Sequence, residues 1–78
     1  MASPESSTER AHYKFTVKEY GDGRPWLMCE PMDRELDIVG DGFLGLDLPD
    51  GTTYEEAQRI AISLNDNIKC VSYTKFLG

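Results

Sequence analysis

Residues 43–64 read FLGLDLPDGTTYEEAQRIAISL, and this stretch decides the fold because it contains a strand, a turn and a helix in unbroken succession. Leu44, Leu46 and Leu48 alternate with a glycine and an aspartate, which is the two-residue period of a strand with one buried face. We expect these leucines to lie in the core. Residues 49–51, Pro-Asp-Gly, then predict a turn, since proline restricts φ and glycine tolerates a positive φ.

A helix is predicted to begin directly after this turn. Thr53 and Glu56 have the Thr-x-x-Glu spacing of a capping box, in which each side chain accepts a hydrogen bond from a backbone N–H at the start of the helix. Apolar residues then recur at helical spacing and predict one buried face: Ala57, Ile60, Ala61 and Leu64. Residues 65–67, Asn-Asp-Asn, predict the end of the helix, because asparagine tolerates the left-handed conformation that closes helices.

Strands are expected on both sides of this central stretch. Residues 12–20 alternate between apolar and polar side chains, and residues 26–30 should pair with them as a hairpin. Residues 32–39 fit a short strand, a surface loop or one helical turn, and we favour the short strand. Residues 68–76 are expected to close the sheet as a strand parallel to residues 44–48, through a right-handed crossover.

The predicted fold is α+β: a mostly antiparallel sheet of four or five strands with one helix packed on one face, in the order β-β-(β)-β-α-β. Residues 12–78 are expected to form a single small domain, because a chain of 78 residues supports one core. Residues 1–11, MASPESSTERA, are rich in serine, glutamate and proline, so we expect a disordered tail there.

The last predicted strand has two faces, and its lysines decide between them. Lys69 and Lys75 favour water, so we expect Ile68 and Cys70 to be buried on the opposite face. A sheet covered by one helix leaves its other face open, and an exposed apolar area of this kind often marks an interaction site. The predicted interaction surface combines aromatic and apolar residues with lysines: Trp26, Lys14, Lys18, Lys69, Val71, Tyr73 and Lys75.

The charge of the chain argues against phosphate-bearing partners. The net charge is -6, and residues 30–56 contain nine acidic residues and a single base, Arg34. Such a chain repels phosphate, which disfavours nucleic acid or an anionic membrane as its main partner. No apolar segment typical of secretion or long enough to span a bilayer is present. Cys29 and Cys70 have no metal-binding spacing and are interpreted as buried free thiols, and we expect a cytoplasmic protein.

No motif in the chain predicts catalysis, and we expect neither enzymatic activity nor a cofactor or metal. Residues 40–45 match G-x-G-x-x-G, but a phosphate loop must open into a helix, whereas these residues lead into a strand. A calcium loop starting at Asp37 would have Val39 and Leu48 at two ligand positions. His12 is the only histidine, and no cysteine or second histidine lies nearby in the sequence to complete a zinc site.

Residues 47–57, DLPDGTTYEEA, are similar to the strand-to-helix junction of HicB-type antitoxin domains, which place a D-L-P and a Ser/Thr-x-E-E-A near each other after antiparallel strands. In that family a further stretch separates the two pieces, and this chain lacks it. The resemblance covers turn and capping residues, so it implies no site residues here.

The sequence supports a small non-enzymatic protein-interaction module that binds an unknown protein partner or a second copy of itself. Aromatic and methionine side chains carry much of the energy of interfaces, so Trp26, Met28, Phe43 and Tyr73 are the first candidates for the contact, although Trp26 fits the core equally well. The alternative function is nucleic-acid binding, as in an antitoxin-like regulator, through the lysine-bearing sheet face.

Overall fold

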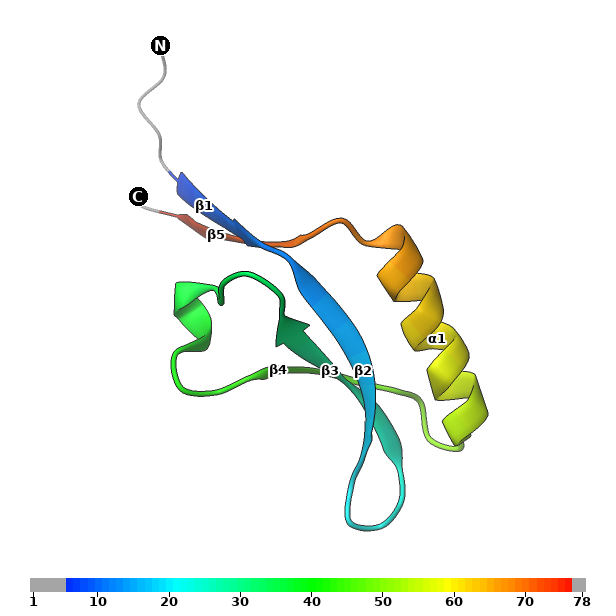
Figure 1. The fold of residues 1–78 in the computed structure, drawn as a ribbon. Coiled ribbons are helices and arrows are strands. Elements are labelled where there is room, and N and C mark those ends of the chain that lie inside the picture. Colours follow the sequence, from blue (N-terminus) through cyan, green and yellow to red (C-terminus); the bar gives the residue numbers. More distant parts are fainter. Residues whose placement is uncertain (1–5, 77–78) are drawn as a thin grey trace.

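The computed structural model describes residues 6–76, which form an α+β fold of one α-helix and five strands in antiparallel sheets (Figure 1). The predicted class and the order β-β-β-β-α-β are confirmed. In chain order the elements are β1 (Ser6–Ala11), β2 (Tyr13–Glu19), β3 (Pro25–Pro31), the short 3-10 helix η1 (Asp37–Val39), β4 (Leu44–Asp47), α1 (Tyr54–Asn67) and β5 (Val71–Phe76).

The strands form two sheets rather than one. β2, β3 and β4 make a three-stranded antiparallel sheet in that order, and β1 and β5 make a two-stranded antiparallel ribbon. Only His12 separates β1 from β2, so the two strands follow one long, bent path (Figure 1). The ribbon therefore continues from the β2 edge of the larger sheet.

The expected parallel pairing of the last strand with residues 44–48 is wrong, because β5 pairs antiparallel with β1. The position of α1 explains the difference. Near the C-terminal end of α1, the Asn65 side chain is hydrogen-bonded to the backbone of Phe15 in β2. The chain therefore leaves the helix on the β2 side of the sheet, close to β1, which directly precedes β2. β4 lies at the opposite edge of the sheet, so β5 pairs with β1 and not with β4.

Residues 6–11 differ from the expected disordered tail, because they form β1. The Oγ1 atoms of Thr8 and Thr74 lie 2.9 Å apart across the ribbon, and Ala11 is only 1% exposed. A strand ladder uses backbone groups, so a segment with few apolar side chains can pair once β5 is beside it. Residues 1–5 of the expected tail lie outside the described residues.

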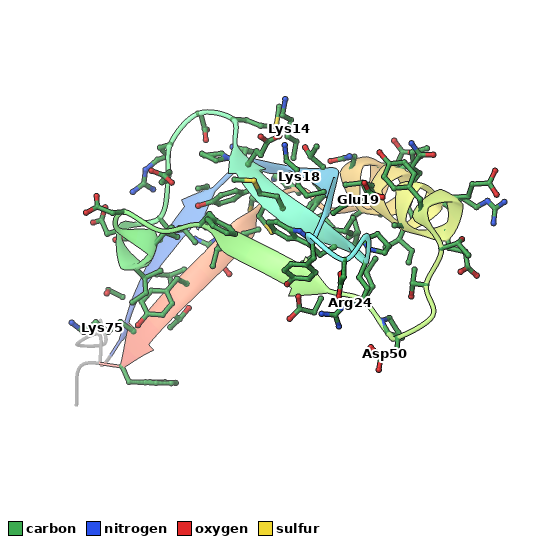
Figure 2. All side chains as sticks on the ribbon, turned by 90° about the horizontal axis from the view of Figure 1, so that it is seen from below. Lys14, Lys18, Glu19, Arg24, Asp50 and Lys75 are labelled. Carbon is green, nitrogen blue, oxygen red and sulfur yellow. The ribbon has the colours of Figure 1, made fainter. Side chains whose placement is uncertain are left out.

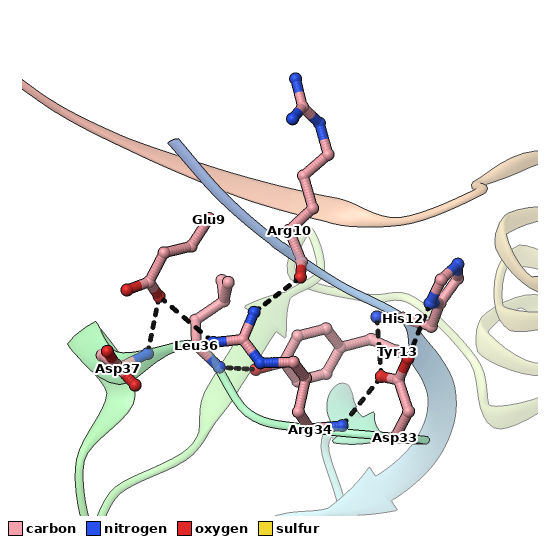
Figure 3. Close-up of polar contacts among 8 residues, drawn as sticks. All are labelled: Glu9, Arg10, His12, Tyr13, Asp33, Arg34, Leu36 and Asp37. Carbon is pink, nitrogen blue, oxygen red and sulfur yellow. Dashed lines mark hydrogen bonds and ion pairs between the residues drawn. The ribbon is translucent and has the colours of Figure 1, made fainter. Parts of the chain in front are cut away.

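Residues 32–39 form a loop that ends in η1, so the favoured short strand is wrong. Leu36 is 2% exposed, and its N–H donates to the hydroxyl oxygen of Tyr13 at 3.1 Å. The N–H of Asp37 donates to Oε1 of Glu9 at 2.9 Å. Side chains of β1 and β2 thus satisfy backbone groups that a strand would have directed to a neighbouring strand (Figure 3).

The core lies between α1 and the sheet and continues under the ribbon. Ala57 and Ala61 are buried, which lets α1 lie close to β2 and β3. The cluster of buried residues beside them consists of Ala11, Tyr13, Phe15, Cys29 and Leu36. The leucines of residues 44–48 lie only partly in the core: Leu44 and Leu48 are half-buried, and Leu46 is 39% exposed because β4 is the strand farthest from β2 and α1.

Candidate interaction surface

The predicted surface residues fall into two separate groups. Lys14, Lys18 and Trp26 share one face of the three-stranded sheet, and Lys18 is the direct neighbour of Trp26 across the β2–β3 ladder. Lys75 lies in the ribbon, and Figure 2 shows it far from Lys14 and Lys18. Lys69 lies in the connection between α1 and β5. The lysines therefore do not form one continuous surface.

Val71 and Tyr73 do not lie on an open surface, because both are half-buried and pack against the core cluster. The structure differs here from the expected burial of Ile68 and Cys70, since Ile68 is 40% exposed and Cys70 is only half-buried. The register explains this orientation: Val71 lies opposite the buried Ala11, so the side of β5 that carries Val71 and Tyr73 faces the core.

The face of the three-stranded sheet that α1 leaves uncovered is the candidate site, and we call it the open face. Phe15 and Cys29 point into the core, so their sequence neighbours point to the other side of the sheet. Alternation along the three strands places the following large side chains on the open face: Lys14, Lys18, Tyr20, Trp26, Met28 and Phe43.

Three aromatic side chains gather on the open face, and we call Tyr20, Trp26 and Phe43 the aromatic strip. The ring of Trp26 stacks on Tyr20 with 5.7 Å between centroids, and its centroid lies 5.5 Å from that of Phe43. Phe43 is 60% exposed and Tyr20 is 44% exposed, while Trp26 between them is half-buried. The strip is thus a preformed apolar surface with Trp26 at its centre.

Gly45 makes room for the central ring. A Cβ atom at this position would stand 3.0 Å from Cζ3 and 3.2 Å from Cε3 of Trp26. Such distances are shorter than ordinary van der Waals contact, so a side chain at residue 45 would require the indole to shift by a few tenths of an ångström. The backbone of β4 at Gly45 therefore packs against the Trp26 ring of the aromatic strip.

Polar contacts surround the aromatic strip. The Tyr20 hydroxyl donates to Oδ1 of Asp47 at 2.8 Å, and this hydrogen bond raises the pKa of Tyr20 above its usual value. The guanidinium of Arg24 lies 5.4 Å from the centroid of the Tyr20 ring, and its Nε donates to Oδ2 of Asp22 at 2.8 Å. Both tyrosine and arginine are therefore held in place at one end of the strip.

A second polar pair lies farther along the open face. The hydroxyl of Thr16 donates to Oε1 of Glu30 at 2.6 Å, and this hydrogen bond lowers the pKa of Glu30. Lys14 is the neighbour of Glu30 across the ladder. The open face thus has an apolar centre and a rim of charges of both signs, an arrangement typical of protein interfaces.

Sequence reasoning missed Tyr20 and Gly45. The alternating pattern predicts Tyr20 only as the end of a strand, but it lies two residues after Lys18, on the same side of the strand as Lys18. The sequence identifies Gly45 only as a residue that alternates with the leucines of the predicted strand. The position of Gly45 next to Trp26 follows from the β3–β4 register, which pairs Trp26 with Asp47 and Met28 with Gly45, whereas the position of Tyr20 follows from the β2–β3 register.

Other candidate sites have simpler structural roles. Nδ1 of His12 lies 3.0 Å from Oδ2 of Asp33, and this hydrogen bond lowers the pKa of the aspartate. Burial raises the pKa of the Cys29 thiol, which opposes formation of a reactive thiolate. Residues 40–45 lead into β4 and not into a helix. Among residues 6–76, no three His, Cys, Asp or Glu side chains are grouped so as to hold a metal ion.

An open cleft of about 340 Å³ lies at the end of the aromatic strip, between the β2–β3 turn and the segment that leads into α1. Its walls include Tyr20, Arg24, Asp47 and Asp50. Arg24 and Asp47 are already engaged by Asp22 and Tyr20, respectively. The cleft therefore extends the polar rim of the open face.

Comparisons with protein-family models, with curated proteins and with solved structures find no match for this chain. None of the helices in residues 6–76 has the length and apolar character needed to cross a membrane.

Proposed function

We propose that this protein is a small non-enzymatic interaction module that binds another protein through the open face of the β2–β3–β4 sheet. The observation that supports this function is the aromatic strip, in which Trp26 stacks on Tyr20 and lies tilted against Phe43 on the side of the sheet opposite α1. Free thiols at Cys29 and Cys70 are consistent with a cytoplasmic setting, where disulfides are rare.

The physical argument concerns preorganisation. Aromatic side chains dominate many interfaces because they bury a large area and lose little conformational entropy. Trp26 is already held by Tyr20, Phe43 and the space above Gly45, so a partner would not have to order it. Phe43, at 60% exposed, offers further apolar area to that partner.

Phe43→Ser and Phe76→Ser make a matched pair for the test, because Phe76 is 81% exposed but lies on the ribbon. We expect Phe43→Ser to remove self-association measured by light scattering, or to remove specific partners captured from the native host. Phe76→Ser should retain them, and circular dichroism checks that both variants fold. Equal binding by the wild type and Phe43→Ser would contradict the proposal.

Nucleic-acid binding is the second candidate, because Lys14 and Lys18 share the open face with the aromatic strip. Bases can stack on aromatic side chains and phosphates can bind lysines, but the net charge of -6 opposes the binding of nucleic acid. Titration with labelled RNA and DNA at two salt concentrations separates the two functions. A steep decrease of affinity with salt, together with loss of binding in Lys18→Glu, would support nucleic acid as the partner.

A further inference from the structure

Within residues 6–76, no strand pairs with the outer edge of β2. In the order β2-β3-β4, β2 is the terminal strand of its sheet. The N–H and C=O of Phe15 point away from β3, because both are bonded to the side chain of Asn65. Backbone groups alternate in direction along an antiparallel strand, so Val17 and Glu19 direct theirs to the same outer side.

Asn65 closes this edge at one position only. Its Oδ1 accepts from the Phe15 N–H at 2.8 Å, and its Nδ2 donates to the Phe15 C=O at 3.0 Å. The carboxamide thus replaces one peptide group of a neighbouring strand. The portion of the edge that begins at Val17 is left for another strand.

An apolar groove runs beside that portion of the edge. It has a volume of about 440 Å³ and lies between β2 and α1, which Figure 1 shows alongside the strand. Val17 and Ala61 contribute to its lining, together with Tyr54 and Ile62. Ile62 is 61% exposed and Tyr54 is 44% exposed, so the helix presents apolar side chains next to the strand edge.

We propose that the outer edge of β2 at residues 16–19 binds an extended segment of another protein as an additional antiparallel strand. The segment has an acidic residue opposite Lys18 and an apolar residue that enters the groove beside Ile62. Main-chain hydrogen bonds hold such a strand, while side-chain pockets select its sequence. This edge adjoins the open face, because Lys18 is the direct neighbour of Trp26, but its backbone groups and the groove beside α1 are not part of the aromatic strip.

Charge favours an acidic residue in this place. Lys18 has Trp26, not a carboxylate, as its direct neighbour on β3, whereas Lys14 has Glu30. Opposite charges on directly paired residues of neighbouring strands stabilise the pair. The net charge of the chain is negative, but charges farther than about 8 Å are largely screened at physiological salt. Glu30 interacts with both Lys18 and Lys14, and Glu19 follows Lys18 on the other face of the sheet. Lys18 therefore has carboxylates in its surroundings but lacks a directly paired one on the β2–β3 ladder.

A second copy of β2 is a poor occupant in each symmetric antiparallel register. A register centred on Val17 requires the Phe15 edge, which Asn65 occupies. A register centred on Lys18 places Lys18 opposite Lys18 of the second copy. A register centred on Glu19 places the two Glu19 carboxylates opposite each other. Like charges directly opposite each other destabilise strand pairing. The edge therefore discriminates against self-association and favours a different chain.

Two short synthetic peptides test the proposal: one alternates isoleucine with glutamate, and the other alternates isoleucine with lysine. We expect the glutamate peptide to slow amide exchange of Val17 and Glu19, measured by NMR. Lys18→Glu should lower the affinity for the glutamate peptide about fivefold and raise the affinity for the lysine peptide. Lys69→Glu has the same charge change outside the edge and should leave both affinities unaltered. Ile62→Ser should weaken both peptides, because the groove loses apolar area.

Three outcomes would overturn the proposal. Neither peptide slows exchange at Val17 or Glu19 in the wild type; Lys18→Glu and Lys69→Glu weaken the glutamate peptide equally; or the peptides perturb Phe43 on the open face without protecting the edge. NMR spectra of each variant confirm that the fold is retained before affinities are compared.

Discussion

At the scale of single residues, Asn65 joins parts of the chain that are far apart in the sequence. A carboxamide has both a donor and an acceptor, so it can satisfy the N–H and the C=O of one strand residue together. Asn65 does this for Phe15, which fixes the C-terminal end of α1 against the edge of β2. The sequence predicts asparagine here only as a helix terminator, whereas the structure gives it a tertiary role.

Replacing Asn65 by leucine should lower the free energy of unfolding by about 1–3 kcal/mol, because the two hydrogen bonds to Phe15 are lost and cannot be replaced by the new side chain. Urea denaturation measures the change. Asn67→Ala is the matched control, since the Asn67 side chain bonds only to Ser63 within its own helix. Equal losses in the two variants would show that the contact with β2 contributes nothing.

At the scale of elements, the start of α1 shows how local sequence determines local structure. Thr53 Oγ1 accepts from the Glu56 N–H at 3.1 Å, and Glu56 Oε1 accepts from the Thr53 N–H at 2.9 Å, which confirms the predicted capping box. All its atoms lie within one turn of the chain. Residues 32–39 are the opposite case, because their conformation depends on Glu9 and Tyr13.

The capping box should make the stability of the fold depend on pH. The hydrogen bond from the Thr53 N–H lowers the pKa of Glu56 below its ordinary value of 4.5. A lowered pKa in the folded state means that the contribution is complete above pH 4.5 and is lost as the pH falls through the folded-state pKa. We expect Glu56→Gln to show a smaller loss of stability between neutral and acidic pH than the wild type, measured by urea denaturation. Parallel pH profiles would contradict this.

At the scale of the whole molecule, the ribbon of β1 and β5 extends from the larger sheet, and the described chain has dimensions of 49 × 25 × 23 Å (Figure 1). A two-stranded ribbon is marginally stable by itself. Contacts with the loop before η1 hold it, and Arg34 contributes one of them by donating from Nη1 to the Arg10 C=O at 2.9 Å (Figure 3). The ribbon therefore depends on the loop more than the three-stranded sheet does.

Native-state hydrogen exchange should find lower opening free energies for amides of β1 and β5 than for those of β3, which has a strand on each side. Arg34→Ala should accelerate exchange in the ribbon without affecting β3, because it removes the bond to Arg10. Arg59→Ala, a change of the same type on the exposed side of α1, serves as the control. Identical opening free energies in the ribbon and β3 would show that both sheets unfold as one unit.

The sequence by itself determined the elements whose signals are local: the alternating strands of the hairpin, the capped amphipathic helix and the presence of a sheet face without a helix. Tertiary structure alone decided that β5 pairs with β1, that Leu36 enters the core, and that Lys14 and Lys18 are separated from Lys75. Capping and alternation act between residues a few positions apart, so a linear pattern contains them. Strand partners and side-chain neighbours depend on which distant segments meet. Strands pair through backbone hydrogen bonds, which nearly every residue type can form, so the sequence contains little information on which strands pair.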